Sequence, residues 1–359
     1  MFGEIGTERY LISMLLTMIT ITGLILIAKK YKIGIDCKDK DKPQKMHCGD
    51  IPRIGGLGIF IGMLPVATTH LGFLFILSAI PAFLAGFAED LLDRLNPKKR
   101  LMIMVLSAIL AIFLLNALVF DIGYIKFPYV VAFVFTIVAI IGVINSINII
   151  DGLNGLASGF SMIALFSFSV VLYQYHDYEL LSISLTLLAA TAGFFLFNFP
   201  YGKIFLGDGG SYLLGFSLAV LSILIVARHP EISPWYPLLV MIYPIWEVIF
   251  SIYRRKFLRN VDPMSPDKLH LHSLLYKRVF KKNYLASAFI LMLVSVFSFL
   301  AILFKEDTVS LTLFTLLFVS GYVFLYFAII KFKTKKINHL KIVENSIFVA
   351  IILLNKLIR

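Results

Sequence analysis

Acidic side chains stand where long apolar segments of this sequence begin or end. Glu89 and Asp90 follow one such segment, Asp151 follows another, and Asp208 precedes a third. Carboxylates near a bilayer core are costly to bury, so residues of this kind usually serve a function. Carboxylate oxygens suit a divalent cation such as Mg²⁺, and Mg²⁺ sites commonly include the phosphates of a substrate. The sequence therefore predicts a cation site for a phosphate-bearing substrate at one membrane face.

The stretch from Asn145 to Gly155 is the most informative of these motifs. Asn148 and Asp151 lie three residues apart, so a helical turn would place both side chains on one face. Asn154 follows them as a third amide. Capping of two helix ends explains some of this polarity, but three amides and an acid in so short a stretch exceed what capping requires. We interpret the stretch as part of an active site.

A second motif, from Asn198 to Ser211, joins two apolar segments and contains Lys203 and Asp208. Glycines flank Asp208 on both sides. A glycine-rich turn that enters a helix offers backbone N–H groups to a phosphate, and Lys203 would add positive charge. The alternative is a re-entrant turn in which the aspartate is only a cap.

Two histidines, His270 and His272, would share a face in an extended segment and diverge in a helix. They could bind phosphate, transfer protons or ligate a metal, and ordinary surface histidines are the alternative. Arg53 suits bidentate contact with phosphate, although the positive charge of a cytoplasmic loop explains it equally well. Glu89 and Asp90 could hold Mg²⁺, or could be a solvated helix end paired with nearby basic residues.

Membrane helices must position these motifs. The chain is 59% hydrophobic and only 15% charged, with a mean hydropathy of +0.90, whereas a soluble domain is about half apolar and a quarter charged. We predict an all-α polytopic membrane protein, with 1–359 as a single integral membrane catalytic domain and 342–359 as a C-terminal helix that spans the membrane or lies in its interface. About 11 transmembrane helices are expected, near 10–28, 54–70, 72–88, 101–119, 129–147, 155–173, 180–197, 210–227, 236–252, 284–304 and 309–330.

The positive charges predict the orientation. With the N-terminus outside, 27 Lys and Arg residues fall in the inner loops and 4 in the outer segments, which is the bias expected of cytoplasmic loops. Every polar motif then lies at a cytoplasmic helix end. The net charge of +12 is explained in the same way, so no nucleic-acid partner is expected. Cys37 and Cys48 share one Lys-rich loop, where neither a disulfide nor a metal site is expected.

Together the motifs resemble those of the polyprenyl-phosphate N-acetylhexosamine-1-phosphate transferases. The likeness extends from His47 to Arg278. The motifs that carry it are, in the family's order, His47 with Pro52 to Gly56, the acids Glu89 and Asp90, Asn145 to Ala157, Lys203 to Ser211, and His270 with His272. The resemblance implies transfer of a sugar 1-phosphate from a UDP-N-acetylhexosamine to undecaprenyl phosphate, with release of UMP and a requirement for Mg²⁺ or Mn²⁺. It also implies a bacterial inner (cytoplasmic) membrane location, an active site on the cytoplasmic face and a homodimer.

The resemblance also assigns roles to residues. The catalytic candidates are Asp90, Glu89, Asp151, Asp208, His270 and His272. The substrate-binding candidates are Asn148, Asn154, Asn198, Lys203, Arg53, His47 and Arg278. The metal-ligand candidates are Asp208, Asp90 and Asp151.

Departures from the family pattern indicate the branch. Glu89 stands where most relatives have Asp, so we favour Asp90 as the critical acid. Leu271 separates the two histidines and Asn154 is an amide, whereas the branch that makes lipid I has three consecutive histidines and usually an Asp. Both differences favour initiation of an O-antigen, teichoic-acid or capsule glycan over the phospho-MurNAc-pentapeptide transferase alternative. The sequence does not choose among GlcNAc, GalNAc, QuiNAc and FucNAc.

Two other classes of function are alternatives. A proton- or ion-coupled transporter should place polar groups at the bilayer midplane and often contains inverted repeats. Here the polar groups crowd one face and no repeat is evident. A catalytically inactive scaffold for glycan assembly is a further alternative. Within the enzyme interpretation, we expect direct attack by the lipid phosphate, with a covalent phospho-aspartate as the rival.

Overall fold

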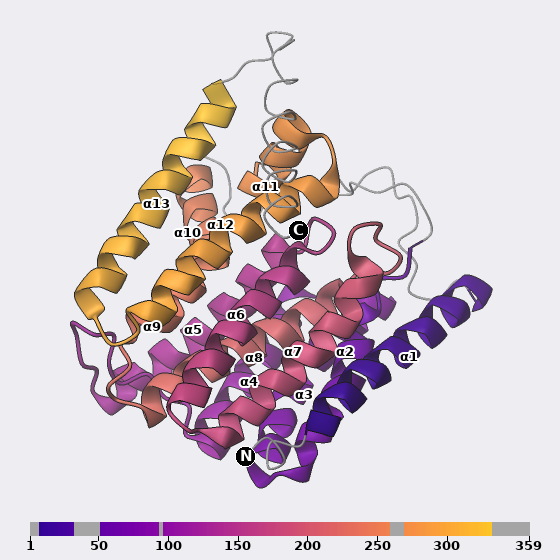
Figure 1. The fold of residues 1–359 in the computed structure, drawn as a ribbon, viewed down its shortest axis with the longest axis horizontal. Helices are drawn as coiled ribbons and strands as arrows, with labels where there is room; N and C mark the ends of the chain where they lie inside the picture. The colour runs from indigo at the N-terminus through magenta and orange to yellow at the C-terminus, as the bar shows by residue number, and fades with distance from the viewer. Residues whose placement is uncertain (1–6, 32–50, 93–95, 259–268, 332–359) are drawn as a thin grey trace, which may run out of the picture.

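The computed structural model describes residues 7–31, 51–92, 96–258 and 269–331, which form helices joined by short connections (Figure 1). Over these ranges the fold is all-α, as predicted, with an isolated bridge between Asp121 and Lys126. The elements are α1 (Thr7–Tyr31), α2 (Gly55–Met63), η1 (Leu64–Thr68), α3 (His70–Leu92), α4 (Pro97–Leu115), α5 (Tyr129–Ile150), α6 (Leu156–Gln174), α7 (Tyr178–Asn198), α8 (Gly207–Arg228), α9 (Trp235–Val240), α10 (Ile242–Tyr253), η2 (Arg254–Leu258), α11 (Leu271–Leu274), η3 (Leu275–Phe280), α12 (Asn283–Leu303) and α13 (Thr308–Lys331).

Helix α8 is the centre of the bundle. It packs against α3 and α5 most extensively and also against α2 and α6, and nearly all of its residues are buried. A helix that is apolar on every side belongs in the interior of a protein. Because α8 begins at the Asp208 motif, its position decides where that motif lies.

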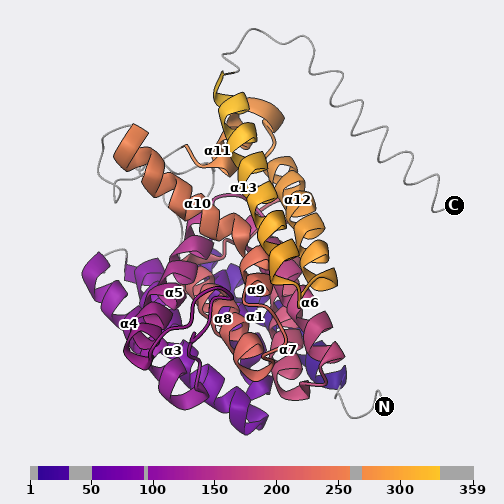
Figure 2. The ribbon, with the colours of Figure 1, turned by 90° about the vertical axis from the view of Figure 1, so that its left-hand side faces the viewer.

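The outer helices complete the bundle. α1 packs on α2 and α7, and α6 on α7, while α12 packs on α6 and on α9. α12 and α13 lie side by side at one edge (Figures 1 and 2). In Figure 2, α10 reaches past the ends of the central helices on the same side of the bundle as α11, which carries the second histidine.

Eight helices in the described ranges are long and apolar enough to cross a membrane: α1, α3, α5, α6, α7, α8, α12 and α13. They coincide with eight of the expected spans, and the chain is a multi-pass membrane protein. The expected spans near 54–70, 101–119 and 236–252 differ. The total of 11 and the orientation therefore stay predictions, and the C-terminal helix at 342–359 lies outside the described residues.

Prolines and basic residues explain the three differences. α2 ends at Met63, and Pro65 is the second residue of the short 3₁₀ segment η1 that follows, because proline cannot donate the next helical hydrogen bond. Pro244 likewise cannot donate a hydrogen bond to the carbonyl four residues earlier, at Val240, and α9 ends there. α4 carries three basic residues in its first turn, so it lacks a fully apolar window of bilayer length.

Close approach of α5 and α8 depends on Gly215, and this predicts an effect on stability. A Cβ atom at Gly215 would lie 2.6 Å from the Cα of Ile144, so the two backbones would have to separate. We expect Gly215→Ala to destabilise the detergent-solubilised protein by about 1–3 kcal/mol, as overpacking does. Thermal unfolding in detergent would measure this change in stability.

Gly142→Ala in α5 is the matched control, because nothing lies within 4 Å of a Cβ there. Alanine favours the helix by roughly 1 kcal/mol over glycine, so this variant should unfold at the same or a higher temperature. Equal destabilisation by both variants would contradict the close approach.

Candidate functional site

Asp90 and Asp208 meet at the start of α8, although 118 residues separate them in the sequence. Asp90 lies in the last turn of α3. Its Oδ1 accepts a hydrogen bond from the backbone N–H of Asp208 at 2.9 Å, and its Oδ2 accepts one from Gly209 at 2.8 Å. The first N–H groups of a helix have no partner inside the helix, so the Asp90 carboxylate caps α8 from a neighbouring helix. The predicted proximity of these two acids is confirmed.

Glycines make this approach possible. A Cβ at Gly86 in α3 would overlap the carbonyl group of Asp208, and one at Gly207 would overlap both the carbonyl of Arg53 and the carboxylate of Asp90. Gly207 also has a φ of +76°, in the left-handed region that favours glycine. The glycine before Asp208 therefore serves the backbone geometry of the turn.

The segment before α2 is paired with the segment before α8. The backbone N–H of Phe205 donates to Pro52, and those of Gly55 and Gly56 donate to Phe205 and Leu206. This pairing brings Arg53 to the acids. Its Nη2 lies 3.8 Å from Asp90 Oδ1 and 3.8 Å from Asp208 Oδ1.

The Asp208 carboxylate is held from both sides. Asn148, in the last turn of α5, donates from Nδ2 to Asp208 Oδ1 at 3.0 Å and to Ser211 Oγ at 3.0 Å. Arg100 Nη1 donates to Asp208 Oδ2 at 3.1 Å. Asp208 thus faces an amide and two guanidinium groups.

Arg100 is a site residue that the sequence analysis missed. It lies in the first turn of α4, where its Nη1 is also 3.4 Å from the hydroxyl of Tyr212 and 3.9 Å from Glu89 Oε1. The basic run that begins after Pro97 was interpreted as cytoplasmic loop charge or as a pairing partner of Glu89 and Asp90 at a solvated helix end. Its position directly after the paired acids was the available signal.

Asp151 completes the acidic cluster, which we define as Asp90, Asp151 and Asp208. It follows α5, and its N–H donates to the carbonyl of Asn148 at 3.3 Å. Burial raises the pKa of the Asp151 carboxyl well above its usual value; the charges of Asp208 and Asp90 raise it further, and Arg53 opposes the shift. The three acids therefore act on one another electrostatically.

Asn154 and Asn198 brace the turns around the site. Asn198 Oδ1 accepts from the Gly155 N–H at 2.6 Å, and its Nδ2 donates to the Ile204 carbonyl at 2.8 Å. Asn154 donates from Nδ2 to the Pro200 carbonyl at 3.0 Å. Both side chains are almost fully buried and tie the turn after α5 to the turn after α7. Their predicted contact with substrate stays a prediction.

The remaining basic candidates occupy different places. Lys203 is exposed in the turn before α8. Arg278 donates to the carbonyls of Ile329 and Ile330 at the end of α13, where basic side chains commonly satisfy free carbonyls. His47 lies outside the described residues. Substrate contact by these residues stays a prediction.

The two histidines share a face. His270 has an extended backbone and precedes α11, which contains His272. Their rings stack in parallel, 5.4 Å apart. A Cβ on Gly152 would lie 3.0 Å from His272 Nε2, so this ring borders the residue next to Asp151. Burial lowers the pKa of His272 to about 4, against the opposing charge of Glu247, so His272 is neutral at neutral pH.

The His270 ring is held by Glu247, a second residue that the sequence analysis missed. His270 Nδ1 lies 2.9 Å from Glu247 Oε1. A single carboxylate inside the apolar run of α10 was the available signal.

The described residues contain no group of three or more His, Cys, Asp or Glu side chains arranged for a metal ion. Both oxygens of Asp90 already accept backbone hydrogen bonds. Carboxylate and amide oxygens nevertheless gather at Asp208, Asp151 and Asn148, and oxygen is the donor type that Mg²⁺ prefers. The chemistry of these donors fits a hard divalent cation, with Asp208 and Asp151 better suited than Asp90.

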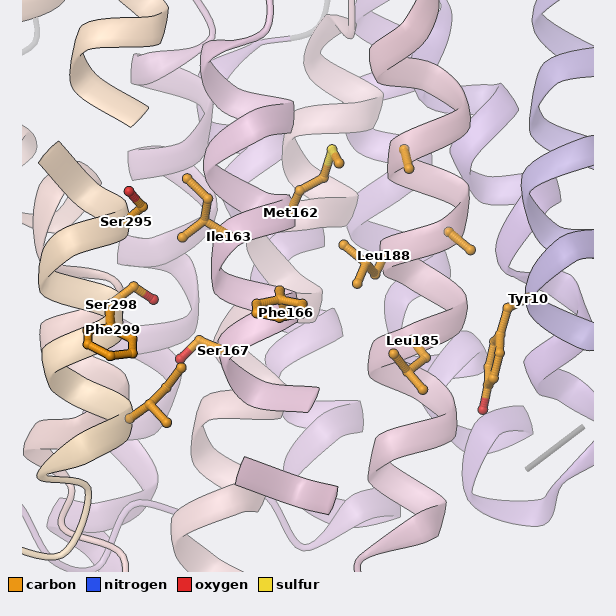
Figure 3. A pocket seen from close by; sticks show the side chains of 13 residues that line it. Tyr10, Met162, Ile163, Phe166, Ser167, Leu185, Leu188, Ser295, Ser298 and Phe299 are labelled. Carbon is orange, nitrogen blue, oxygen red and sulfur yellow. The ribbon is translucent and has the colours of Figure 1, made fainter. Parts of the chain in front are cut away.

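A cavity of about 650 Å³ lies between α6, α7 and α12 (Figure 3). Its lining includes Met162, Phe166, Leu185 and Phe299, with Tyr10 from α1 at one side. None of its lining residues belongs to the acidic cluster. A phosphate-bearing substrate would find no charged partner in this apolar space.

Comparison with known proteins identifies the relatives of the chain. Residues 72–226 match the model of glycosyl transferase family 4. A Bacillus subtilis (strain 168) protein named as a probable undecaprenyl-phosphate N-acetylglucosaminyl 1-phosphate transferase is 31% identical over 327 residues, which cover 85% of this chain and 88% of the relative.

Two further relatives are named undecaprenyl-phosphate alpha-N-acetylglucosaminyl 1-phosphate transferases. The Haemophilus influenzae protein is 30% identical over 70% of this chain and 75% of its own length. The Thermotoga maritima protein is 31% identical over 68% of this chain and 74% of its own length. The relatives match most of the length of this chain, and the acidic cluster lies inside the region that matches the family model. The chain therefore belongs to glycosyl transferase family 4.

Proposed function

We propose that this protein transfers an N-acetylhexosamine 1-phosphate from a UDP-sugar to undecaprenyl phosphate and releases UMP. The observation that carries the proposal is the convergence of Asp90, Asp151 and Asp208 with Arg53 and Arg100 at one end of a bundle of membrane helices. The relatives carry the name of this activity. A transporter would place such groups midway along its helices, so the arrangement favours the enzyme.

The physical obstacle to this reaction is repulsion between two phosphate groups, which is strongest where water is excluded. Arg53 and Arg100 flank Asp208 and remain partly exposed, at 31% and 22% of their side chains. Guanidinium groups pair with phosphate oxygens in a bidentate manner. In the proposed complex these two arginines orient the donor diphosphate and offset its charge.

A divalent cation, Mg²⁺ or Mn²⁺, is part of the proposal. Asp208 and Asp151 would hold it, with Asn148 beside them, and the bound ion would supply charge neutralisation at the diphosphate. Asp90 has a different role, because its two oxygens accept from the backbone of α8. In the proposal it keeps the Asp208 turn in place.

The proposed chemistry is direct displacement. An oxygen of the lipid phosphate attacks the β-phosphorus of the UDP-sugar, the bond from this phosphorus to the bridging oxygen breaks, and UMP leaves with the electron pair. A phosphate monoester is already largely ionised at neutral pH, so no strong base is required. Positioning and electrostatic stabilisation account for most catalysis in such transfers.

The cellular setting follows from the same proposal. The acidic cluster would face the cytoplasm, where UDP-sugars occur, and the acceptor would come from the inner leaflet of the bacterial cytoplasmic membrane. The relatives' names make UDP-GlcNAc the first donor to test. The product would start a cell-surface glycan, and a homodimer stays a prediction.

Metal removal and loss of Asp208 should have matching effects. UMP release by purified protein should require undecaprenyl phosphate, stop with EDTA and return with excess Mg²⁺. Asp208→Asn should lower turnover by about 100-fold or more, as expected when a group that stabilises transition-state charge is lost. Asp121→Asn, in the loop between α4 and α5, should retain wild-type turnover. Metal-independent activity would contradict the metal assignment.

Asp90→Asn tests the capping role. An amide offers one acceptor oxygen, so a buried backbone N–H at the start of α8 loses its partner, at a cost of about 1–3 kcal/mol. We expect a lower unfolding temperature together with lower turnover. An Asp90→Asn protein that unfolds like wild type but is inactive would instead make Asp90 a base or a metal ligand.

Arg100→Met tests the arginine that the sequence analysis missed. We expect kcat/KM for the UDP-sugar to fall about tenfold or more, because a hydrogen bond to a charged group is lost. Arg100→Lys should restore only part of the activity, since lysine lacks the planar fork. Arg228→Met is the matched control, because Arg228 pairs with Asp177 and Glu179 at the opposite end of the bundle. Similar losses in both variants would contradict the proposal.

A further inference from the structure

Glu247 is a fully buried carboxylate in α10, with 0% of its surface exposed. A charge in such a place is costly unless it is paired and hydrogen-bonded. Around Glu247 the bonding is complete: His270 Nδ1 lies 2.9 Å from Oε1, the Leu271 N–H donates to Oε1 at 3.2 Å, and the Tyr322 hydroxyl donates to Oε2 at 2.9 Å. These partners come from the α11 segment and from α13, so one side chain joins three parts of the chain.

The donors around Glu247 fix the state of the His270 ring. Leu271 can only donate its N–H, and the Tyr322 hydroxyl donates to the other oxygen. A carboxylate that receives such bonds on both oxygens acts as an acceptor, so the Nδ1 of His270 carries a proton and donates it to Glu247. Nε2, on the far side of the ring, is then the nitrogen available to another partner.

The backbone on the other side of His270 is also held. Arg254 donates to the carbonyl of Leu269 at 2.5 Å and to the hydroxyl of Tyr326 at 2.8 Å. Leu269 and Leu271 are thus both tied to buried charged side chains on or next to α10. The position of His270 is determined by this support rather than by the short helix α11.

The held ring connects to the acidic cluster. His270 stacks in parallel on His272, and His272 Nε2 borders Gly152, the residue after Asp151. Support at Glu247 therefore sets the position of both rings next to the turn that carries Asp151.

We propose that Glu247 is a positioning residue for the phosphate transfer: it accepts the Nδ1–H of His270 and so holds the ring with Nε2 facing the substrate, where the doubly protonated ring donates its Nε2–H to a phosphate oxygen. This inference rests on the proposed function. Glu247 does not touch the reacting atoms and acts through His270.

Two variants of Glu247 separate positioning from space filling. Glu247→Gln keeps the shape and one acceptor oxygen but removes the charge, whereas Glu247→Met keeps similar volume and removes both acceptors. We expect kcat/KM for the UDP-sugar to fall about tenfold or more in Glu247→Met and less in Glu247→Gln. Rates are compared per folded protein, measured by size-exclusion chromatography and thermal unfolding in detergent.

A double-mutant cycle with His270→Gln gives the deciding readout. If Glu247 acts through His270, Glu247→Gln should lower kcat/KM severalfold in wild type and have almost no further effect in the His270→Gln background. Additive losses would overturn the proposal and leave Glu247 a structural residue. Glu247 variants as active as an active wild type would also overturn the positioning role, without affecting the proposed function. A wild-type protein that releases no UMP would refute the proposed function itself.

Asp177→Asn is the matched control. Asp177 is a largely buried carboxylate that lies 3.2 Å from His229 Nε2 and accepts from the Leu180 N–H at the start of α7. It reproduces the carboxylate–histidine pair at the opposite end of the bundle. The kcat/KM of the Asp177→Asn protein should remain at the wild-type value. A loss equal to that of Glu247→Gln would mean that the Glu247 variants lose activity through general destabilisation.

Discussion

The capping of α8 by Asp90 is the interaction on which the rest of the site depends. The first N–H groups of a helix are unpaired and carry partial positive charge, and a carboxylate from α3 satisfies two of them. This contact fixes the turn at Gly207. This turn then directs the Asp208 side chain toward Asn148 and Arg100. The acidic cluster is therefore assembled by a bond between two helices rather than within one.

Glycine permits the contact and buried polar bonds stabilise it. Gly86 and Gly207 leave space where the backbones of α3, α8 and the Arg53 segment meet, in keeping with the small residues that membrane helices use at close contacts. Around this centre Asp208 accepts from Arg100 and Asn148, and the buried Glu247 accepts from the α11 segment and α13. Carboxylates near the membrane are tolerated because fixed donors pair with them and form hydrogen bonds to them.

Prediction from the sequence succeeded where the signal is local. Bilayer-length apolar runs predict helices because the backbone must satisfy its own hydrogen bonds in lipid, and eight spans were found at the expected places. Prediction of helix ends was less successful where a proline removes the hydrogen bond to the carbonyl four residues earlier. Pro244 ends α9 at Val240, so the span near 236–252 is two helices.

The sequence by itself determined the all-α membrane fold and the identity of the acids, because residue type and apolar spacing are local properties. Only the tertiary structure decided which groups they contact. It made Asp90 a cap and showed Asn198 tying two turns together, and it brought Arg100 and Glu247 into the site. The physical reason is that these bonds join residues far apart in sequence, and their geometry exists only after the helices have packed around α8.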